Sequence, residues 1–331
     1  MNSLDVTAPT RNLALDLARV TEAAALSAGR WMGRGQKESA DLAAVEAMRM
    51  VLSTVAIDGV IIIGEGEKDK APMLYNGERV GNRSGPQVDV AVDPIDGTRP
   101  LAFGRTNSIA TVALAPHGTM FDPGPFVYMN KIAVGPEAKG KINFEAPIID
   151  NLKAIARAKD KEVEDITTII LDRPRHEEMI AEIRKAGARI RLIPDGDVAA
   201  ALMTAWPDSG VDVLFGIGGT PEGVLAACAL RAMGGEIQGK LFARDQDELN
   251  RGREAGYDFE KILTMDDLVS SEDVFFAATG ITDGELLKGV RYFGDGARTD
   301  SLVVRGLTGT VRQIIATHRM DKLHTISSIK Y

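Results

Sequence analysis

Apolar residues in the first part of the chain recur with a helical period. Within 11–31 they return every three or four positions, which predicts an amphipathic helix that ends at the glycines Gly33 and Gly35. A second helix is expected at about 39–55, after a short polar break. The chain therefore opens with two helices that need an apolar surface to cover.

The next apolar segments have the period of strands. The β-branched run at 60–63 predicts a buried strand, and the alternating valines at 88–92 predict another that ends at Pro94. A long loop is expected between them, at 68–87. Two more strands are predicted at 107–114 and 126–134, and we expect them to pair in antiparallel fashion through the turns between them.

The second half changes pattern, after a helix at 151–158 and a charged link at 159–164. Short apolar strands at 167–171, 188–193 and 211–215 are each followed by a polar junction and a segment of helical period, which predicts an α/β sheet. A strand at 274–278 and a hairpin at 301–305 and 310–317 follow, whereas 239–267 is polar and only partly helical. We expect two lobes, residues 1–160 with α+β character and residues 161–331 with α/β character.

Composition limits the class of protein. The 331 residues are 44% hydrophobic and 26% charged, which is typical of a globular protein too long for one ordinary core. We expect a cytoplasmic protein without a membrane partner, because no apolar run reaches about 18 residues and no signal sequence begins the chain. The net charge of −8 argues against nucleic acid, although an acidic enzyme can still bind phosphates through divalent cations, helix N-termini and local arginines.

The single cysteine, Cys228, lies in the apolar run 224–230 and has no partner for an internal disulfide. A buried structural thiol is the favoured interpretation. No Cys/His set for zinc is present.

Candidate chemistry begins where the strand of alternating valines ends. The run there is Asp93-Pro94-Ile95-Asp96-Gly97-Thr98. Two carboxylates this close repel each other unless a proton or cation lies between them, and oxygen-only clusters suit Mg²⁺ or Mn²⁺. An Asp-rich turn is the alternative, but five fixed residues should occur by chance on the order of once in ten thousand chains. The run is therefore interpreted as a site.

Other acidic residues also follow the ends of predicted elements. Glu65 and Glu67 follow the strand at 60–63 and point to the same side of the chain, and Asp41 lies at a helix start. Thr220 and Pro221 are interpreted as an N-cap and a proline at the first helical position. Glu222 then falls in the first turn of that helix. Taken alone, each is better explained as part of a solvated turn or as a residue that stabilises the helix dipole. Together with the aspartates they favour a shared site.

Three polar junctions after the later strands suit an anionic ligand. Arg173 and Arg175 offer forked donors that match phosphate oxygens, and Gly219 lets a ligand approach the backbone. A solvated helix start and a tight turn are the alternatives. Tyr128, in the middle of a strand, is either a core residue or a ligand contact.

The chain resembles the class II fructose-1,6-bisphosphatases of bacteria, in the lithium-sensitive, metal-dependent sugar-phosphatase superfamily. The resemblance spans nearly the whole length and depends on 33–37 with Ala40-Asp41, 64–67 with 71–75, Asp93-Pro94-Ile95-Asp96-Gly97-Thr98, 172–176, 194–197, 216–223 and 294–299. It implies an α/β (α+β) fold, a layered α-β-α-β-α sandwich with two sheets and the active site at the junction of two lobes. Residues 1–160 would carry most metal ligands, and 161–331 would carry the sugar-phosphate junctions and Glu222.

The resemblance also implies roles for individual residues. The implied metal ligands are Asp41, Glu65, Asp93, Asp96 and Glu222, and the implied substrate contacts are Asp96, Gly97, Thr98, Tyr128, Arg173, Pro174, Arg175, Asp195, Gly196, Asp197 and Gly219. The expected cofactor is Mg²⁺ or Mn²⁺, the expected partner is a sugar bisphosphate, and a homo-oligomer, dimer or tetramer, is expected. Glu222 should lie close to Asp93, at the seam between the two sheets.

The implied reaction is hydrolysis of the 1-phosphate of fructose 1,6-bisphosphate by a metal-activated water, as in gluconeogenesis. We expect Thr98 to orient the water and Asp41 or Glu67 to accept its proton. Photosynthetic members that also cleave sedoheptulose 1,7-bisphosphate have Cys-Glu where this chain has Ile95-Asp96, which favours fructose bisphosphate alone. The alternatives are a sedoheptulose-bisphosphatase or dual-specificity enzyme, another phosphatase of the superfamily, and a sugar-phosphate-binding regulator without turnover.

Overall fold

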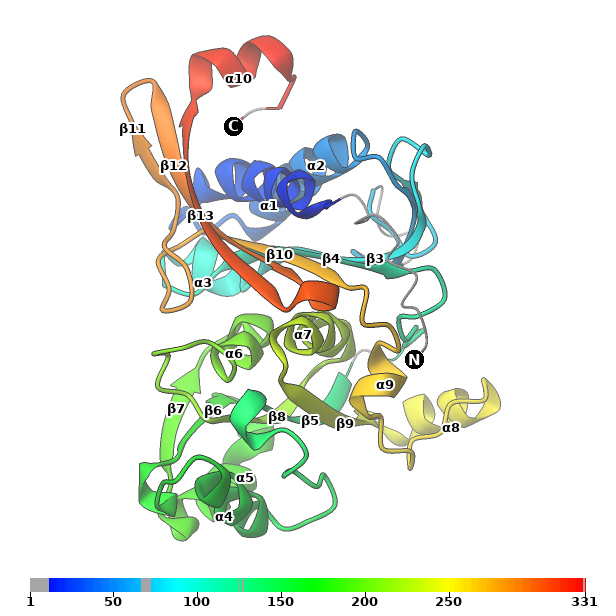
Figure 1. Cartoon of the computed structure of the whole chain (residues 1–331), viewed down its shortest axis with the longest axis vertical. Helices are drawn as coiled ribbons and strands as arrows, with labels where there is room; N and C mark the ends of the chain where they lie inside the picture. Colours follow the sequence, from blue (N-terminus) through cyan, green and yellow to red (C-terminus); the bar gives the residue numbers. More distant parts are fainter. Residues whose placement is uncertain (1–11, 67–72, 125, 127, 330) are drawn as a thin grey trace, which may run out of the picture.

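The computed structural model describes all residues except 1–11, 67–72, 125, 127 and 330. It has two mixed sheets in a five-layered arrangement that alternates helices and sheets (Figure 1). Helices α1 (Ala14–Gly29) and α2 (Lys37–Leu52) cover the outer face of the first sheet, as the helical period predicts. The layered α/β fold expected from the sequence is confirmed.

The first sheet has eight strands. Their order is β11 (Arg291–Phe293), β12 (Gly296–Arg305), β10 (Phe275–Gly280), β4 (Ile109–Pro116), β3 (Gln87–Asp96), β1 (Asp58–Ile63) and β2 (Arg79–Val80), and β13 (Thr310–Arg319) pairs with β12. The predicted hairpin of β12 and β13 is confirmed. The predicted loop at 68–87 lies partly outside the described residues, and its later part contains β2.

The second sheet has five strands. Their order is β7 (Arg189–Ile193), β6 (Thr167–Leu171), β8 (Val213–Gly219), β5 (Tyr128–Val134) and β9 (Glu236–Phe242). Strand β6 is parallel to β7 and β8, whereas β5 is antiparallel to β8 and β9. Strand β9 opens the stretch 239–267, and helices α8 (Gln246–Glu254) and α9 (Met265–Leu268) follow within it.

The expected pairing of the strands at 107–114 and 126–134 is wrong. Both edges of β4 are occupied, by β3 and β10, and β5 lies in the other sheet between β8 and β9. Sheet membership thus crosses the expected lobe boundary at residue 160, since β5 belongs with later strands and β10–β13 return to the first sheet. The division into 1–160 and 161–331 stays a prediction about folding units.

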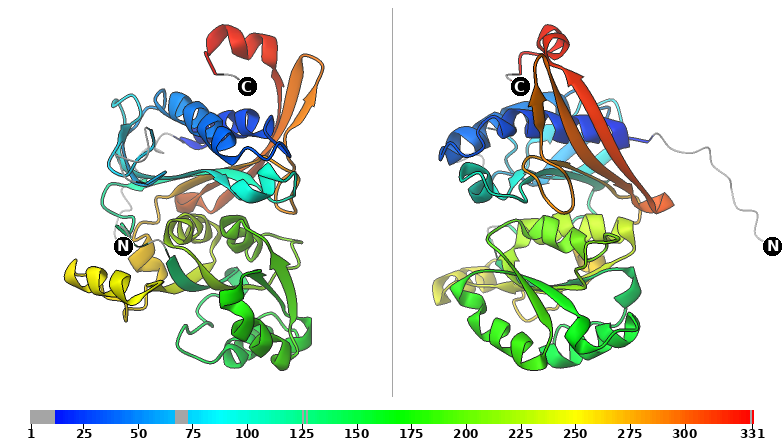
Figure 2. Two further views of the ribbon diagram at one scale, coloured as in Figure 1. Left: turned by 180° about the vertical axis from the view of Figure 1, so that it is seen from behind. Right: turned by 90° about the vertical axis from the view of Figure 1, so that its left-hand side faces the viewer.

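Helices α6 (Asp197–Met203) and α7 (Thr220–Met233) lie between the two sheets, as both views in Figure 2 show. The largest apolar core surrounds them, and it includes Ala91 from β3, Leu214 from β8 and Cys228 from α7. Helices α4 (Ile148–Ala158) and α5 (Glu177–Ala186) cover the outer face of the second sheet. The short α3 (Thr98–Ala102) follows β3, and α10 (Met320–Ile326) follows β13.

The valines of β3 explain how the first sheet is covered. Val88, Val90 and Val92 pack with α1 and α2, whereas Ala91 faces the layer between the sheets. Buried Asp89 is satisfied by Thr119, whose N–H donates to it at 2.9 Å. Strand β3 is therefore buried on both faces before it reaches its acidic end.

One buried polar contact joins α1 to the returning strands. Glu22 of α1 is 9% exposed and accepts a hydrogen bond from the Thr299 hydroxyl of β12 at 3.3 Å. The ring of His318 on β13 lies 4.0 Å from the same carboxylate. Within the described residues, no helix is both long and apolar enough to cross a membrane.

Candidate active site

A β-bulge at the end of β3 orients the side chains of Asp93 and Asp96. Asp93 lies opposite Thr111 and Asp96 lies opposite Ile109, so three steps along β3 face two steps along β4. Such a bulge bends the strand and turns its side chains away from the regular alternation. The Ile95 N–H donates to Asp93 at 3.0 Å and so fixes that carboxylate. The structure thus continues β3 to Asp96, beyond the predicted end at Pro94.

Asp96 connects β3 to the layer between the sheets. It is 4% exposed, and its Oδ2 accepts a hydrogen bond from the Ala199 N–H of α6 at 3.1 Å. Gly97 then turns the chain with a φ of 93°, where a side chain would be strained, and its carbonyl accepts from the Ser108 hydroxyl at 2.8 Å.

Thr98 lies between two acceptors. Its hydroxyl can donate to the Ile95 carbonyl at 3.2 Å or to the carboxylate of Asp41 on α2. The pKa of Asp41 is raised, chiefly by burial, and the contact with Thr98 opposes this rise. The structure therefore brings together the two residues predicted to orient and deprotonate a water, whereas Glu67 lies outside the described residues.

Glu222 reaches the site from the first turn of α7. A Cβ on Gly219 would lie 1.6 Å from Glu222 Oε2, although the φ of Gly219 is an ordinary −64°. A side chain at this position would displace the Glu222 carboxylate, although the backbone conformation itself permits one. The predicted N-cap Thr220 is wrong: Gly219 is the N-cap, without a side-chain hydrogen bond, and Thr220 is the first helical residue.

The carboxylates repel one another across the seam. Burial raises the pKa of Asp93 well above its usual range, and the neighbouring charges of Asp96, Glu222 and Glu65 add to the rise. Burial likewise raises the pKa of Asp96, followed by the charge of Asp197. Glu222 from α7 and Asp93 from β3 are thus neighbours, as expected for a site at the seam.

Burial and neighbouring negative charge also raise the pKa values of the two glutamates, Glu222 and Glu65. Burial raises the pKa of Glu222 to about 7, with Asp197 as the next cause. Desolvation also raises the pKa of Glu65 to about 7, and the charge of Asp41 adds to it. We define the carboxylate cluster as Asp41, Glu65, Asp93, Asp96 and Glu222.

A divalent cation fits the chemistry of this donor set, because it would offset both the burial and the repulsion that raise these pKa values. As the side chains stand, no three Asp, Glu, His or Cys residues in the described ranges form a ready metal-ligating group. Binding an ion would therefore require some of these side chains to change rotamer.

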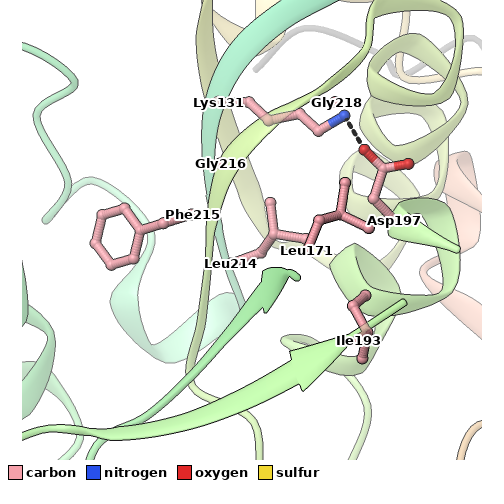
Figure 3. A pocket seen from close by; sticks show the side chains of 8 residues that line it. All are labelled: Lys131, Leu171, Ile193, Asp197, Leu214, Phe215, Gly216 and Gly218. Carbon is pink, nitrogen blue, oxygen red and sulfur yellow. Dashed lines mark hydrogen bonds and ion pairs between the residues drawn. The ribbon is translucent and has the colours of Figure 1, made fainter. Parts of the chain in front are cut away.

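The sequence interpretation missed Lys131, a buried cation beside the cluster. Lys131 on β5 is 2% exposed, and its ammonium group donates to Asp197 (Figure 3). It also donates to the Gly219 carbonyl at 3.0 Å. A Cβ on Gly218 would lie 1.9 Å from Asp197 Oδ2, so glycine also leaves room for this pair. A lysine within an apolar strand is the signal that could have revealed it, since lysine is almost never fully buried without a partner.

The predicted substrate contacts fall into two groups. Arg175 lies 5.3 Å from the ring centre of Tyr128, and its Nε and Nη2 donate to the Ile217 carbonyl at 3.0 and 2.7 Å. Arg173 instead faces Asp195 at 3.7 Å. Pro174 begins a short helical turn, Pro174–His176, that contains Arg175, and Gly196 caps α6 with a φ of 86°.

His176 holds the strand ends that carry these groups. Its Nδ1 donates to the Leu171 carbonyl at 2.7 Å, and its Nε2 accepts from the Ile217 N–H at 2.8 Å. Burial lowers the pKa of His176, in keeping with a neutral ring in this tautomer.

Comparison with known proteins shows the family to which the chain belongs. A family model described as bacterial fructose-1,6-bisphosphatase, glpX-encoded, matches residues 11–318. The curated relative "Fructose-1,6-bisphosphatase 1 class 2" of Escherichia coli K12 is 47% identical over 325 residues, which cover 94% of this chain and 96% of the relative. Proteins named "Fructose-1,6-bisphosphatase class 2" from Escherichia coli O6:H1 and Shigella flexneri match with the same identity and coverage.

Proposed function

Because the chain belongs to the class II fructose-1,6-bisphosphatases, a family of metal-dependent phosphatases, we propose that it hydrolyses the 1-phosphate of fructose 1,6-bisphosphate to give fructose 6-phosphate and phosphate, with Mg²⁺ or Mn²⁺ as cofactor. The observation that carries the proposal is the carboxylate cluster, in which burial and neighbouring negative charges raise the pKa of Asp93 and Asp96.

The cluster residues Asp41, Glu65, Asp93, Asp96 and Glu222 would hold the metal. When bound, the metal lowers the pKa of water and neutralises the phosphoryl oxygens. Within the chain, the contact between Thr98 and Asp41 supports Thr98 as the group that orients the water and Asp41 as the group that accepts its proton.

The remaining residues would bind the sugar and its second phosphate. Arg173 and Arg175 offer guanidinium donors to that phosphate, Tyr128 lies beside Arg175, and Asp195 suits sugar hydroxyls because carboxylates accept O–H hydrogen bonds but repel anions. One carboxylate oxygen of Asp197 accepts a hydrogen bond from Lys131, so that oxygen is less available to a sugar hydroxyl.

The test is phosphate release from fructose 1,6-bisphosphate under each metal, beside sedoheptulose 1,7-bisphosphate and inositol monophosphate. We expect fructose 1,6-bisphosphate to be preferred. Faster release from another substrate would assign a different phosphatase activity, and binding of the bisphosphate without release would identify a regulator. Light scattering of the full chain tests the proposed homo-oligomer, a dimer or tetramer.

A further inference from the structure

Lys131 is a buried cation that holds one carboxylate, that of Asp197, beside the carboxylate cluster. The lysine is 2% exposed, and among the described residues its ammonium group is the one hydrogen-bond partner of that carboxylate (Figure 3). The same ammonium group donates to the Gly219 carbonyl at 3.0 Å. Lys131 therefore joins β5 to the first residue of α6 and to the N-cap of α7.

Asp197 is an electrostatic neighbour of the carboxylate cluster but not a member of it. After burial, its charge is the largest cause that raises the pKa of Asp96, and the same holds for Glu222. A Cβ on Gly196, the residue before Asp197, would lie 3.7 Å from Asp96 Oδ2. If Asp197 had no cation of its own, it would be a further acidic ligand for a metal bound by the cluster.

The surroundings of the pair leave little room for water. The cavity beside it measures about 10 Å³, which is about the volume that one water needs. Four apolar side chains line this cavity: Leu171, Ile193, Leu214 and Phe215. A Cβ on Gly218 would lie 1.9 Å from Asp197 Oδ2 and 2.9 Å from Lys131 Nζ, so the backbone of β8 packs directly against the pair. A buried carboxylate that loses its cation here needs another one, and a bound metal would supply it.

We propose that Lys131 is a positioning residue that holds the Asp197 carboxylate away from the metal, so that only the carboxylate cluster binds the ion. This inference rests on the proposed function, because it requires the cluster to be the metal site. The number of carboxylate ligands sets the affinity for a cation, so Lys131 would limit how tightly the metal is bound. Each additional carboxylate would also neutralise part of the charge that a metal offers to water and to phosphoryl oxygens.

Calorimetry of the full chain with Mn²⁺, in the absence of substrate, tests the proposal. Lys131→Met releases the Asp197 carboxylate, so the dissociation constant for Mn²⁺ should fall at least about tenfold below that of the parent protein. A merely structural role would weaken metal binding or leave it unchanged. Lys131→Gln is the milder variant, because its amide keeps a donor in the layer, and it should tighten Mn²⁺ binding at least about threefold.

Thermal unfolding verifies that each variant is folded, and Lys131→Gln decides the question if Lys131→Met does not fold. Mn²⁺ affinity that is unchanged or weaker in the folded variants would overturn the proposal.

A double-mutant cycle separates the position of Asp197 from the simple loss of a positive charge. In an Asp197→Asn background, Lys131→Met should change the Mn²⁺ affinity by less than about twofold, because no carboxylate is left to release. If the tighter binding persisted in that background, the lost charge would be its cause and the proposal would be overturned.

Lys159→Met is the matched control. Lys159 lies 2.9 Å from the buried carboxylate of Asp212, which directly precedes β8, whereas Gly219 ends that strand. The same substitution at this distant ion pair should leave the Mn²⁺ affinity unchanged, and equally tight binding there would overturn the proposal. If the parent protein binds Mn²⁺ but releases no phosphate from fructose 1,6-bisphosphate, only the proposed function fails, because these affinities are measured without substrate.

Discussion

The substitution Gly219→Ala tests whether the position of Glu222 matters for activity. The new Cβ would lie 1.6 Å from Glu222 Oε2, and ordinary contact begins at 3.4 Å, so the carboxylate must move by about 1.8 Å. Metal–ligand distances tolerate only about 0.2 Å. Because a misplacement of about 1 Å can reduce the rate on the order of a hundredfold, we expect kcat/KM to fall at least that far.

The fold should survive this change. The φ of Gly219 is −64°, which alanine adopts readily, and the obstacle is the end of a flexible side chain. Replacing glycine where the backbone permits it contributes about 0.4–1 kcal/mol through the unfolded state, so the net change in the free energy of unfolding should stay within about 1 kcal/mol. Urea unfolding measures that change, and calorimetry with Mn²⁺ measures the loss of metal affinity.

The matched control removes the Glu222 carboxylate that the new methyl group would displace. In a Glu222→Ala background, Gly219→Ala should cost little further activity, because no carboxylate remains to be displaced. If Gly219→Ala were equally harmful in both backgrounds, the glycine would act through the substrate and not through Glu222. Full activity of the single variant would refute the role assigned to the Glu222 carboxylate.

Three further predictions concern charges. Asp93→Asn should abolish metal-dependent phosphate release and weaken Mn²⁺ binding while the circular dichroism spectrum is kept, and full activity would contradict the metal assignment. Lys131→Met should lower the free energy of unfolding by about 3–5 kcal/mol in urea titrations, because it leaves the buried Asp197 carboxylate unpaired, and by much less in an Asp197→Asn background. Burial raises the pKa of Glu22 from 4.5 to about 7, so between these pH values the folded state holds a proton that the unfolded state releases. This difference in proton binding stabilises the fold by about 3 kcal/mol below pH 4.5, and the stabilisation is lost as the pH rises to about 7. Urea titrations of metal-saturated Glu22→Gln should therefore show no loss of stability between pH 4.5 and 7. The lowered pKa of the neighbouring His318 should still weaken the fold at acidic pH in this variant. If the free energy of unfolding of Glu22→Gln depended on pH as in the parent protein, the assignment to Glu22 would be refuted.

The sequence predicts elements whose residues repeat. Helices α1 and α2 and strand β3 follow from periodic burial, and the strand ends then indicate where Asp93 and Glu65 lie. Sheet membership does not follow in the same way, because the partner of a strand depends on which edges other strands have already occupied. Strand β5 therefore fitted equally well beside β4 or, as the structure has it, beside β8 and β9.

The acidic residues of the site and two of its arginines, Arg173 and Arg175, could be predicted from the sequence, but the buried lysine could not. Acidic residues after strand ends have a recognisable pattern, and Asp93 and Glu222 do meet across the seam. Lys131 depends on a partner more than sixty residues away, Asp197. Such contacts between distant segments leave no local period in the sequence.

Because α7 is buried between the sheets, Cys228 on this helix is a probe for opening of the layer between them. It is the chain's single cysteine, it is 0% exposed within the central core, and burial raises the pKa of its thiol to about 12. Only opening of the layer between the sheets exposes it to a thiol reagent. Since the same helix carries Glu222, the labelling rate of Cys228 with and without Mn²⁺ measures directly how strongly the occupied site holds the two sheets together.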